Sequence, residues 1–459
     1  MFLSGPAGSG KSHVINACQQ FCKIFCDHAD IPFDNDIFKI TACTGSAAAQ
    51  LASGTTIHSA AELNRKRVTY NAAQWENVNI LFIDEISLFA DRDLIKLDRN
   101  LRALTGLKSK IYGGRNIVFI GDFSQITPFG GDPVYTKHSI IWHDAINSAV
   151  FLNQSHRFNK DPEWGSILKR VSKGNATEDD IKKINSRVID NERVELPKDG
   201  NICYACPTNK GRNAICTKMF YEHIKSTHPK FDEPNIDPPN HTIIIEGKIY
   251  KKKKACTQEF HQTIFNNVGD ADIQTSHNKK IDPALKLYNN IPIMINSNKE
   301  IDKGLANGTL ERFKGIKLKN NNRDNVSYKN WDGYKVRTVS VEDVEYILCE
   351  HWEGKKDRNG IILPPKKFKL YAEKNSVQVT ILLHGCKVNF TVQIQQFGLL
   401  VNIATTGHKL QGMSKDIIIV SDWDYRTSNW VYVVLSRVRT LSGLYLEKPL
   451  DSEKYFKTD

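Results

Sequence analysis

The stretch Gly5-Pro-Ala-Gly-Ser-Gly-Lys-Ser12 decides the fold of the N-terminal region. It follows a short apolar lead and precedes a helical stretch, which is the context of a phosphate-binding loop, or P-loop. The N-terminus of the helix adds a positive dipole that favours anions. We expect Lys11 to reach the outer phosphates of a nucleotide and Ser12 to hold Mg²⁺. The backbone N–H groups that cradle the phosphates are expected around the glycines Gly5, Gly8 and Gly10.

An acidic pair, Asp84-Glu85, follows the apolar run Ile80 to Ile83. A strand buried on both faces has such a sequence, and it delivers the pair to the carboxyl edge of the sheet, where open α/β folds bind ligands. Asp84 is then placed to coordinate the metal, and Glu85 to orient and deprotonate an attacking water. Together with the P-loop, the pair favours ATP hydrolysis over a purely structural role.

A second apolar run, Ile117 to Ile120, ends at Gly121-Asp122 and is followed by Gln125. This order places the Gln125 amide near a γ-phosphate, although a Gly-Asp step after a strand is also a common turn. Between the two runs, four leucines at helical spacing predict a crossover helix. They are Leu94, Leu97, Leu101 and Leu104. Strand, helix and strand in this order predict an α/β fold with a doubly wound parallel sheet.

The composition bounds the class of protein. With 459 residues the chain is too long for one hydrophobic core, so we expect two or more domains. No apolar stretch approaches the length of a membrane span, and the ten scattered cysteines suit reduced thiols, so we expect a nuclear or cytoplasmic protein. The 63 basic and 51 acidic side chains give a net charge of +12, which favours a polyanionic partner.

Beyond Phe151 the pattern changes. Two helical stretches come first, and Thr177 and Asp180 have the spacing of a capping box at the start of the second. Strand-like runs follow at 202–205, 291–295, 417–420 and 431–435, which predict a second α/β domain. Alternating runs between Gly308 and Phe397, such as Val377 to Leu383, predict a small β insert.

Two groups of cysteines have spacings that also occur in metal sites. The first group is Cys18, Cys22 and Cys26. The second is Cys203 and Cys206, with Cys216, His223 and His228 downstream. A helical stripe of small residues typically packs against a core, and the first pair of the second group has the pattern of a short buried strand. We therefore predict no metal cluster in either group.

Further motifs occur in a fixed order along almost the whole chain. They are Thr41-Ala-Cys-Thr44-Gly45, Thr55-Thr-Ile-His58, Phe151-Leu-Asn-Gln-Ser-His-Arg157-Phe, Cys206-Pro-Thr-Asn209, Gly304-Leu-Ala-Asn307-Gly308-Thr309, Thr406-Gly-His408-Lys409-Leu-Gln411-Gly412 and Tyr432-Val-Val-Leu-Ser436-Arg437. With the two nucleotide motifs, this series resembles the superfamily 1B DNA helicases of the petite-integration-frequency (PIF) family. The stretch from Asp91 to Tyr112 is similar to the signature of that family.

The resemblance implies two RecA-like P-loop domains with parallel sheets, and a small SH3-like β insert in the second. The expected bounds are 1–150 for the first domain with a small insert at about 55–78, 151–309 and 396–459 for the second domain, and 310–395 for the β insert. ATP would lie between the two domains. The resemblance gives catalytic roles to Lys11, Glu85, Gln125, Arg157 and Arg437, and places Gly412 at the nucleotide. The two arginines would neutralise charge on the transferred phosphoryl group.

The resemblance also implies a path for single-stranded DNA. Thr44 and His58 would lie along it on the first domain, and His408 and Gln411 on the second. Contacts with phosphates and stacking on bases do not read sequence, so binding to single strands and to DNA forks is expected to tolerate any sequence.

The chain departs from the family pattern at three places. Gly407 stands where an apolar residue is usual, and Cys43 stands where proline is usual. The P-loop begins at Gly5, so the glutamine segment that reads adenine in the family is missing, and we expect a fragment of a longer protein that discriminates ATP from GTP weakly. The stretch Gly130 to Tyr135 is similar to helicase domains of Helitron-type transposons, and a cellular, viral or transposon origin stays open.

The sequence thus predicts an ATP-dependent, Mg²⁺-requiring DNA helicase, with 5′-to-3′ movement implied by the resemblance alone. One alternative is a truncated or decayed domain that binds DNA without unwinding it. Another is a DNA-stimulated ATPase that remodels protein–DNA complexes.

Overall fold

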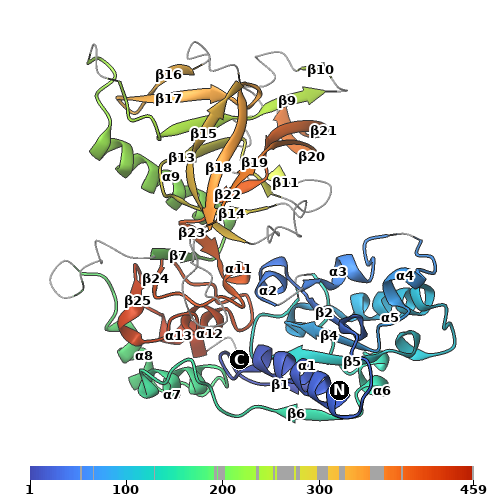
Figure 1. The fold of residues 1–459 in the computed structure, drawn as a ribbon. Helices are drawn as coiled ribbons and strands as arrows, with labels where there is room; N and C mark the ends of the chain where they lie inside the picture. The colour runs from blue at the N-terminus through green and yellow to red at the C-terminus, as the bar shows by residue number, and fades with distance from the viewer. Residues whose placement is uncertain are drawn as a thin grey trace. The chain divides into compact units, whose positions relative to one another are not determined.

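The computed structural model describes residues 1–459 except 52–53, 66, 129, 191–193, 195–201, 234–236, 252–253, 256–272, 275–279, 297–308, 320–325, 352–365, 384–385 and 457–459. The chain divides into two compact units, Met1–Ala205 with Gly407–Asp459, and Cys206–Thr406 (Figure 1). The motif at 304–308 lies outside the described residues. The domain bounds given above stay a prediction.

The first unit contains a sheet of six parallel strands in the order β3-β2-β4-β5-β1-β6. The strands are β1 (Phe2–Ser4), β2 (Phe38–Ala42), β3 (Thr55–Thr56), β4 (Ile80–Asp84), β5 (Asn116–Gly121) and β6 (Ala149–Phe151). The two apolar runs predicted as buried strands are β4 and β5, and they are neighbours in the sheet. The predicted parallel sheet is therefore confirmed.

Helices cover this sheet (Figure 1). The longest are α1 (Lys11–His28) and α5 (Asp91–Thr105). The shorter helices are α2 (Gly45–Gln50), α3 (Ile57–Ala60), α4 (Ala72–Trp75) and α6 (Ile140–Ala145). The four leucines of the predicted crossover helix are all fully buried on α5. On α1, Cys18 and Cys22 pack with Ile15 against the core, as a stripe of small residues usually does.

A second parallel sheet in the same unit contains β7 (Ile202–Cys206), β24 (Ile417–Val420) and β25 (Leu444–Leu446). Its helices are α7 (Pro162–Val171), α8 (Glu178–Asn185), α11 (Gly407–Leu410), α12 (Trp430–Leu435) and α13 (Ser452–Phe456). The capping box at the start of α8 is confirmed. Thr177 Oγ1 accepts a hydrogen bond from the Asp180 amide at 3.2 Å, and Asp180 Oδ2 accepts one from the Thr177 amide at 2.9 Å.

One strand prediction was wrong. The run 431–435 is not a strand but belongs to α12, which begins after Asn429 in a left-handed conformation with φ 61°. All six residues of α12 are buried. A helix that is apolar on every side has no polar stripe, so its sequence cannot be told from that of a buried strand by periodicity.

The second unit joins one long helix, α9 (Asn209–Thr227), to antiparallel β structure. Its strands are β8 (Ile243–Glu246), β9 (Lys248–Lys251), β10 (Lys254–Ala255), β11 (Ile273–Gln274), β12 (Lys280–Ile281), β13 (Ala284–Leu287), β14 (Pro292–Ile295), β15 (Leu310–Leu318), β16 (Val326–Trp331), β17 (Tyr334–Ser340), β18 (Val344–His351), β19 (Lys367–Leu370), β20 (Ala372–Leu383), β21 (Cys386–Phe397), β22 (Leu399–Val401) and β23 (Ala404–Thr406). The main sheets have the orders β13-β8-β17-β16, β19-β18-β15-β14-β22 and β10-β9-β21-β20.

The predicted alternating run Val377 to Leu383 lies in β20, which forms a hairpin with β21. The strands of this region already begin at Ile243, where β8 pairs antiparallel with β13 and parallel with β17. Phe220 and Ile224 of α9 pack against this sheet. The α/β fold class, with parallel sheets and a β-rich region, is confirmed, and the SH3-like form of that region stays a prediction.

Replacing Leu97 by alanine should lower the free energy of unfolding by about 2 to 5 kcal/mol, because it leaves a cavity where α5 packs on the sheet. Ile95→Ala on the same helix is the matched control. Ile95 is 50% exposed, so its loss should change stability by no more than about 0.5 kcal/mol. Chemical denaturation followed by tryptophan fluorescence compares the two variants, and equal effects would contradict the packing described for α5.

Candidate functional site

The P-loop joins β1 to α1 at the carboxyl edge of the six-stranded sheet. Gly8 and Gly10 have φ values of 79° and 91°, a region that favours glycine. Space is also tight at Gly8, because a Cβ there would lie 2.4 Å from the Cβ of Arg157. The buried hydroxyl of Ser9 has no hydrogen-bond partner among the described residues. The loop therefore has a conformation that can bind an anion, and the Ser9 hydroxyl is available to hydrogen-bond a ligand.

Lys11 and Ser12 form the first turn of α1. The Lys11 ammonium donates hydrogen bonds to the carbonyl oxygens of Gly5 at 2.6 Å and Pro6 at 3.1 Å. These bonds hold the ammonium against the loop, and its charge opposes the rise in the pKa of Asp84. Ser12 is exposed. The Lys11 ammonium is thus held directly against the phosphate-binding loop.

The acidic pair ends β4 beside the P-loop. Asp84 Oδ1 accepts a hydrogen bond from the Glu85 amide at 2.8 Å. Burial, followed by the negative charge of Glu85, raises the pKa of Asp84 to about 7. A buried carboxylate of this kind is stabilised by a neighbouring cation, so Asp84 fits a bound Mg²⁺. Glu85 itself has a left-handed backbone, with φ 58° and ψ 41°, at a non-glycine residue.

Gln125 follows β5 and is also buried. Its side-chain nitrogen donates to Asp122 Oδ2 at 3.3 Å, and its backbone carbonyl oxygen accepts from Asn429 Nδ2 at 3.0 Å. The Oε1 atom of Gln125 has no partner among the described residues. The amide is therefore fixed at one end and retains an open acceptor.

Arg437 is buried, and the partly buried Arg157 lies next to it. Arg157 Nη1 donates to the Ser436 carbonyl oxygen at 3.0 Å, and Arg437 Nη2 donates to Ser436 Oγ at 2.7 Å. Burial, with the second guanidinium as a further cause, lowers the pKa of Arg157 to about 9, and burial also lowers the pKa of Arg437. Within the part of the chain that the structure describes, neither arginine forms an ion pair with a carboxylate. The negative charge of Glu85 nevertheless acts on both guanidiniums and opposes the fall in their pKa.

Gln411 and Gly412 lie against Glu85, the second residue of the acidic pair. The Gln411 amide nitrogen donates to Glu85 Oε2 at 3.1 Å and to Ser87 Oγ at 2.9 Å. Gly412 has φ 80°, and a Cβ there would lie 3.3 Å from Glu85 Oε1. Both oxygens of Glu85 are therefore in contact with residues 411–412. The assignment of Gln411 to a DNA strand stays a prediction.

The other residues that were predicted to contact single-stranded DNA lie on, or cap, short helices. Thr44 caps α2, where its Oγ1 accepts from the Ala47 amide at 3.2 Å. His58 on α3 meets the ring of Phe89 edge to face with centroids 5.8 Å apart, and burial lowers its pKa. Burial also lowers the pKa of His408 on α11. Both histidines are therefore neutral near pH 7 and can donate one hydrogen bond each.

The structure explains why glycine stands at position 407. A Cβ there would lie 2.2 Å from Nε1 of Trp430, a residue of α12 that is 1% exposed. The indole fills the space that a side chain at 407 would need. The departure from the family pattern is thus matched by a large residue elsewhere.

Three residues that hold other groups of this site in place were not predicted from the sequence. Ser87 and Ser436 bind the side chains of Gln411 and Arg437, and the hydroxyl of Tyr432 is hydrogen-bonded to the Ala7 backbone of the P-loop. Tyr432 and Ser436 lie within a motif quoted above, which is the only signal the sequence offered. Ser87 follows the acidic pair by two residues.

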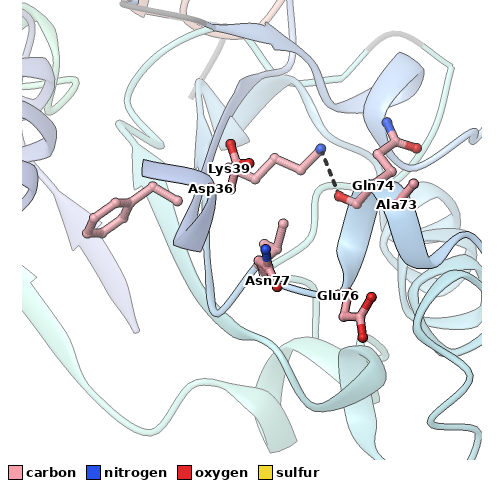
Figure 2. Close-up of a pocket in the computed structure, with 8 residues that line it drawn as sticks. Asp36, Lys39, Ala73, Gln74, Glu76 and Asn77 are labelled. Atoms are coloured by element: carbon pink, nitrogen blue, oxygen red, sulfur yellow. Dashed lines mark hydrogen bonds between the residues drawn. The ribbon is translucent and has the colours of Figure 1, made fainter. Parts of the chain in front are cut away.

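The described residues of the first unit line two cavities, among others. One, of about 380 Å³, adjoins the P-loop and is lined by Pro6, His156, Phe158, Lys169 and Tyr432 among others. Figure 2 shows the other, of about 320 Å³, at the amino ends of β2 and β4. There Lys39 donates to the Gln74 carbonyl oxygen at 3.4 Å and lies over the ring of Trp75. Only the first cavity adjoins the residues described above.

The comparisons with known proteins agree with this geometry. Residues 1–175 match the PIF1-like helicase family. The chain is 28% identical over 213 residues, 42% of its length and 24% of the relative's, to the ATP-dependent DNA helicase PIF1 of Saccharomyces cerevisiae. It is 23% identical over 500 residues, 97% of its length and 44% of the relative's, to the ATP-dependent DNA helicase PIF7 of Trypanosoma brucei brucei. The chain spans less than two thirds of the length of these relatives.

Solved structures show the same fold. The Pif1 helicase of Candida albicans aligns with a TM-score of 0.64 and 19% identity, covering 99% of this chain and 92% of the other. The Bacteroides Pif1 helicase in complex with ADP-AlF3 and single-stranded DNA aligns with a TM-score of 0.60 and 21% identity, covering 99% and 89%. Within the described residues, every helix is too short or too polar to cross a membrane.

Replacing Gly407 by alanine should lower the unfolding midpoint, because the new methyl group would overlap the Trp430 indole. Gly211→Ala on α9 is the matched control, since a Cβ there meets nothing closer than 3.5 Å and alanine favours a helix. The double variant Gly407→Ala with Trp430→Phe should recover part of the loss. Differential scanning calorimetry measures the midpoints, and an unchanged midpoint in Gly407→Ala would refute the contact.

Proposed function

We propose that this chain, whose residues 1–175 match the PIF1-like helicase family, is an ATP-dependent DNA helicase that moves along single-stranded DNA. The relatives named above carry this activity in their names, and the Bacteroides structure holds a nucleotide analogue and a single strand. The observation that supports the proposal most is the pair of adjacent guanidiniums of Arg157 and Arg437, with Arg157 packed against Gly8 of the P-loop. Neither forms an ion pair with a carboxylate among the described residues, so both can approach the negative charge of a transferred phosphoryl group.

The proposed chemistry follows from the positions of the side chains. The P-loop amides and Lys11 bind the outer phosphates, while Ser12 and Asp84 would hold Mg²⁺, which supplies Lewis-acid stabilisation of the developing charge. Glu85 accepts a proton from the attacking water. Gln125 has an open acceptor with which to orient that water, and Gly412 leaves room for the Glu85 carboxylate.

Charge on the phosphoryl group is neutralised from the second parallel sheet. Arg157 and Arg437 are anchored by carbonyl and hydroxyl groups and not by acids, so their positive charge remains available. Arginines in this role are worth about 10³ to 10⁵ in rate in characterised enzymes. We assign Thr44, His58 and His408 to the single strand, because each lies on a loop or short helix next to a nucleotide motif.

The decisive experiment for the proposed function is unwinding of duplexes that carry a 5′ or a 3′ single-stranded tail. We expect ATP-dependent strand separation from the 5′ tail. ATP hydrolysis stimulated by DNA without strand separation would favour the remodelling ATPase, and unwinding from the 3′ tail alone would overturn the implied polarity.

Glu85→Gln should bind ATP normally and hydrolyse it about 10² to 10⁴ times more slowly, because the amide keeps the shape of the side chain but cannot accept a proton. Steady-state phosphate release and equilibrium binding of a fluorescent ATP analogue measure the two quantities. The exposed Glu163→Gln is the control and should leave both unchanged. Lys11→Ala should differ from Glu85→Gln by weakening ATP binding itself. Normal turnover in Glu85→Gln would remove this residue from the mechanism.

A further inference from the structure

Gln411 lies between two parts of the proposed machinery: His408, which is proposed to contact single-stranded DNA, and Glu85, which is the proposed general base. It follows α11, three residues after His408, and its side chain is 3% exposed. Both hydrogen atoms of its amide have acceptors, Glu85 Oε2 at 3.1 Å and Ser87 Oγ at 2.9 Å. A side chain that is buried and whose donors are both used is poorly placed to bind a DNA phosphate.

The Glu85 carboxylate depends on residues 411–412 for its orientation. The backbone of Glu85 is left-handed. This conformation costs about 1 to 3 kcal/mol at a non-glycine residue and persists only where neighbouring residues enforce it. Oε2 is held by Gln411, and Oε1 lies against Gly412, where the absence of a side chain leaves room for it. Ser87 fixes the Gln411 amide from the other side.

We infer that Gln411 is a positioning residue that links the occupancy of the DNA strand to the orientation of Glu85. The inference rests on the proposed function. A strand bound at His408 shifts the segment 407–412, and the hydrogen bond from Gln411 transmits that shift to the carboxylate that activates water. The stimulation of ATP hydrolysis by DNA therefore passes through one side chain, and Gln411 contributes nothing to the affinity for DNA.

The test compares Gln411→Ala with His408→Ala in the complete chain. The affinity for single-stranded oligothymidine is measured by fluorescence anisotropy, and the ATPase kcat is measured with and without that oligonucleotide. Gln411→Ala should bind the strand as tightly as the wild type while its stimulation by DNA falls at least tenfold. His408→Ala should lose affinity for the strand. A Gln411→Ala variant with weakened strand binding and unchanged saturated stimulation would make Gln411 a DNA contact and overturn the inference.

Two further variants keep the test decisive if Gln411→Ala does not fold. Gln411→Glu cannot donate a hydrogen bond to Glu85 Oε2, so it should bind the strand as tightly as the wild type while its stimulation by DNA falls at least tenfold. Ser87→Ala alone should reduce the stimulation by DNA and have no additional effect in Gln411→Glu, since it acts through the same side chain. Full stimulation in Gln411→Glu or additive effects of the two substitutions would overturn the inference.

The outcome for the wild type separates the inference from the proposed function. A wild-type chain without ATPase activity would overturn the proposed function and this inference with it. A wild-type chain stimulated by DNA, together with full stimulation in Gln411→Ala, would overturn the inference alone.

Discussion

The placement of two guanidiniums side by side is the constraint on which the site in the first unit depends. Removing a guanidinium from water costs several kcal/mol unless its donors are satisfied and a negative charge lies near. The buried Arg437 donates to oxygens of Met413, Val433 and Ser436, and Arg157 donates to the Ser436 carbonyl oxygen. The negative charge of Glu85 acts on both arginines, without forming an ion pair with either among the described residues. The backbone around α12 therefore holds the arginines in place, and a bound anion would add to the negative charge that Glu85 supplies.

The same unit holds an acidic pair in unfavourable surroundings. Asp84 is buried with a raised pKa, and Glu85 adopts a left-handed backbone directly after it. Under the proposed function, a nucleotide with its Mg²⁺ would stabilise the ionised form of Asp84, because a neighbouring cation favours the charged carboxylate.

Local patterns predicted the parts of this structure that depend on near neighbours in the sequence. The P-loop context, the buried leucines of α5 and the capping box of α8 all follow from spacings of a few residues. The sequence failed where burial is complete, as in α12, because an element that is apolar all round carries no period.

Contacts between distant residues were also beyond the sequence. Gln411 and Glu85 lie more than 300 positions apart, and nothing in either motif indicates that their side chains meet. Arg157 and Ser436 lie 279 positions apart, and neither motif indicates that the guanidinium binds the Ser436 carbonyl oxygen. Residue types at motif positions predicted which groups the site contains, whereas the partners of each group depend on how the elements pack.

The contact between Gly407 and Trp430 has a consequence for the history of this chain. The indole occupies the volume that a side chain at 407 would need, so residue 407 cannot gain a side chain while residue 430 stays a tryptophan. The order of two substitutions therefore matters: a smaller residue at 430 must come first, because the reverse order passes through a chain with two overlapping side chains. The two positions are therefore expected to vary together among close relatives of this chain.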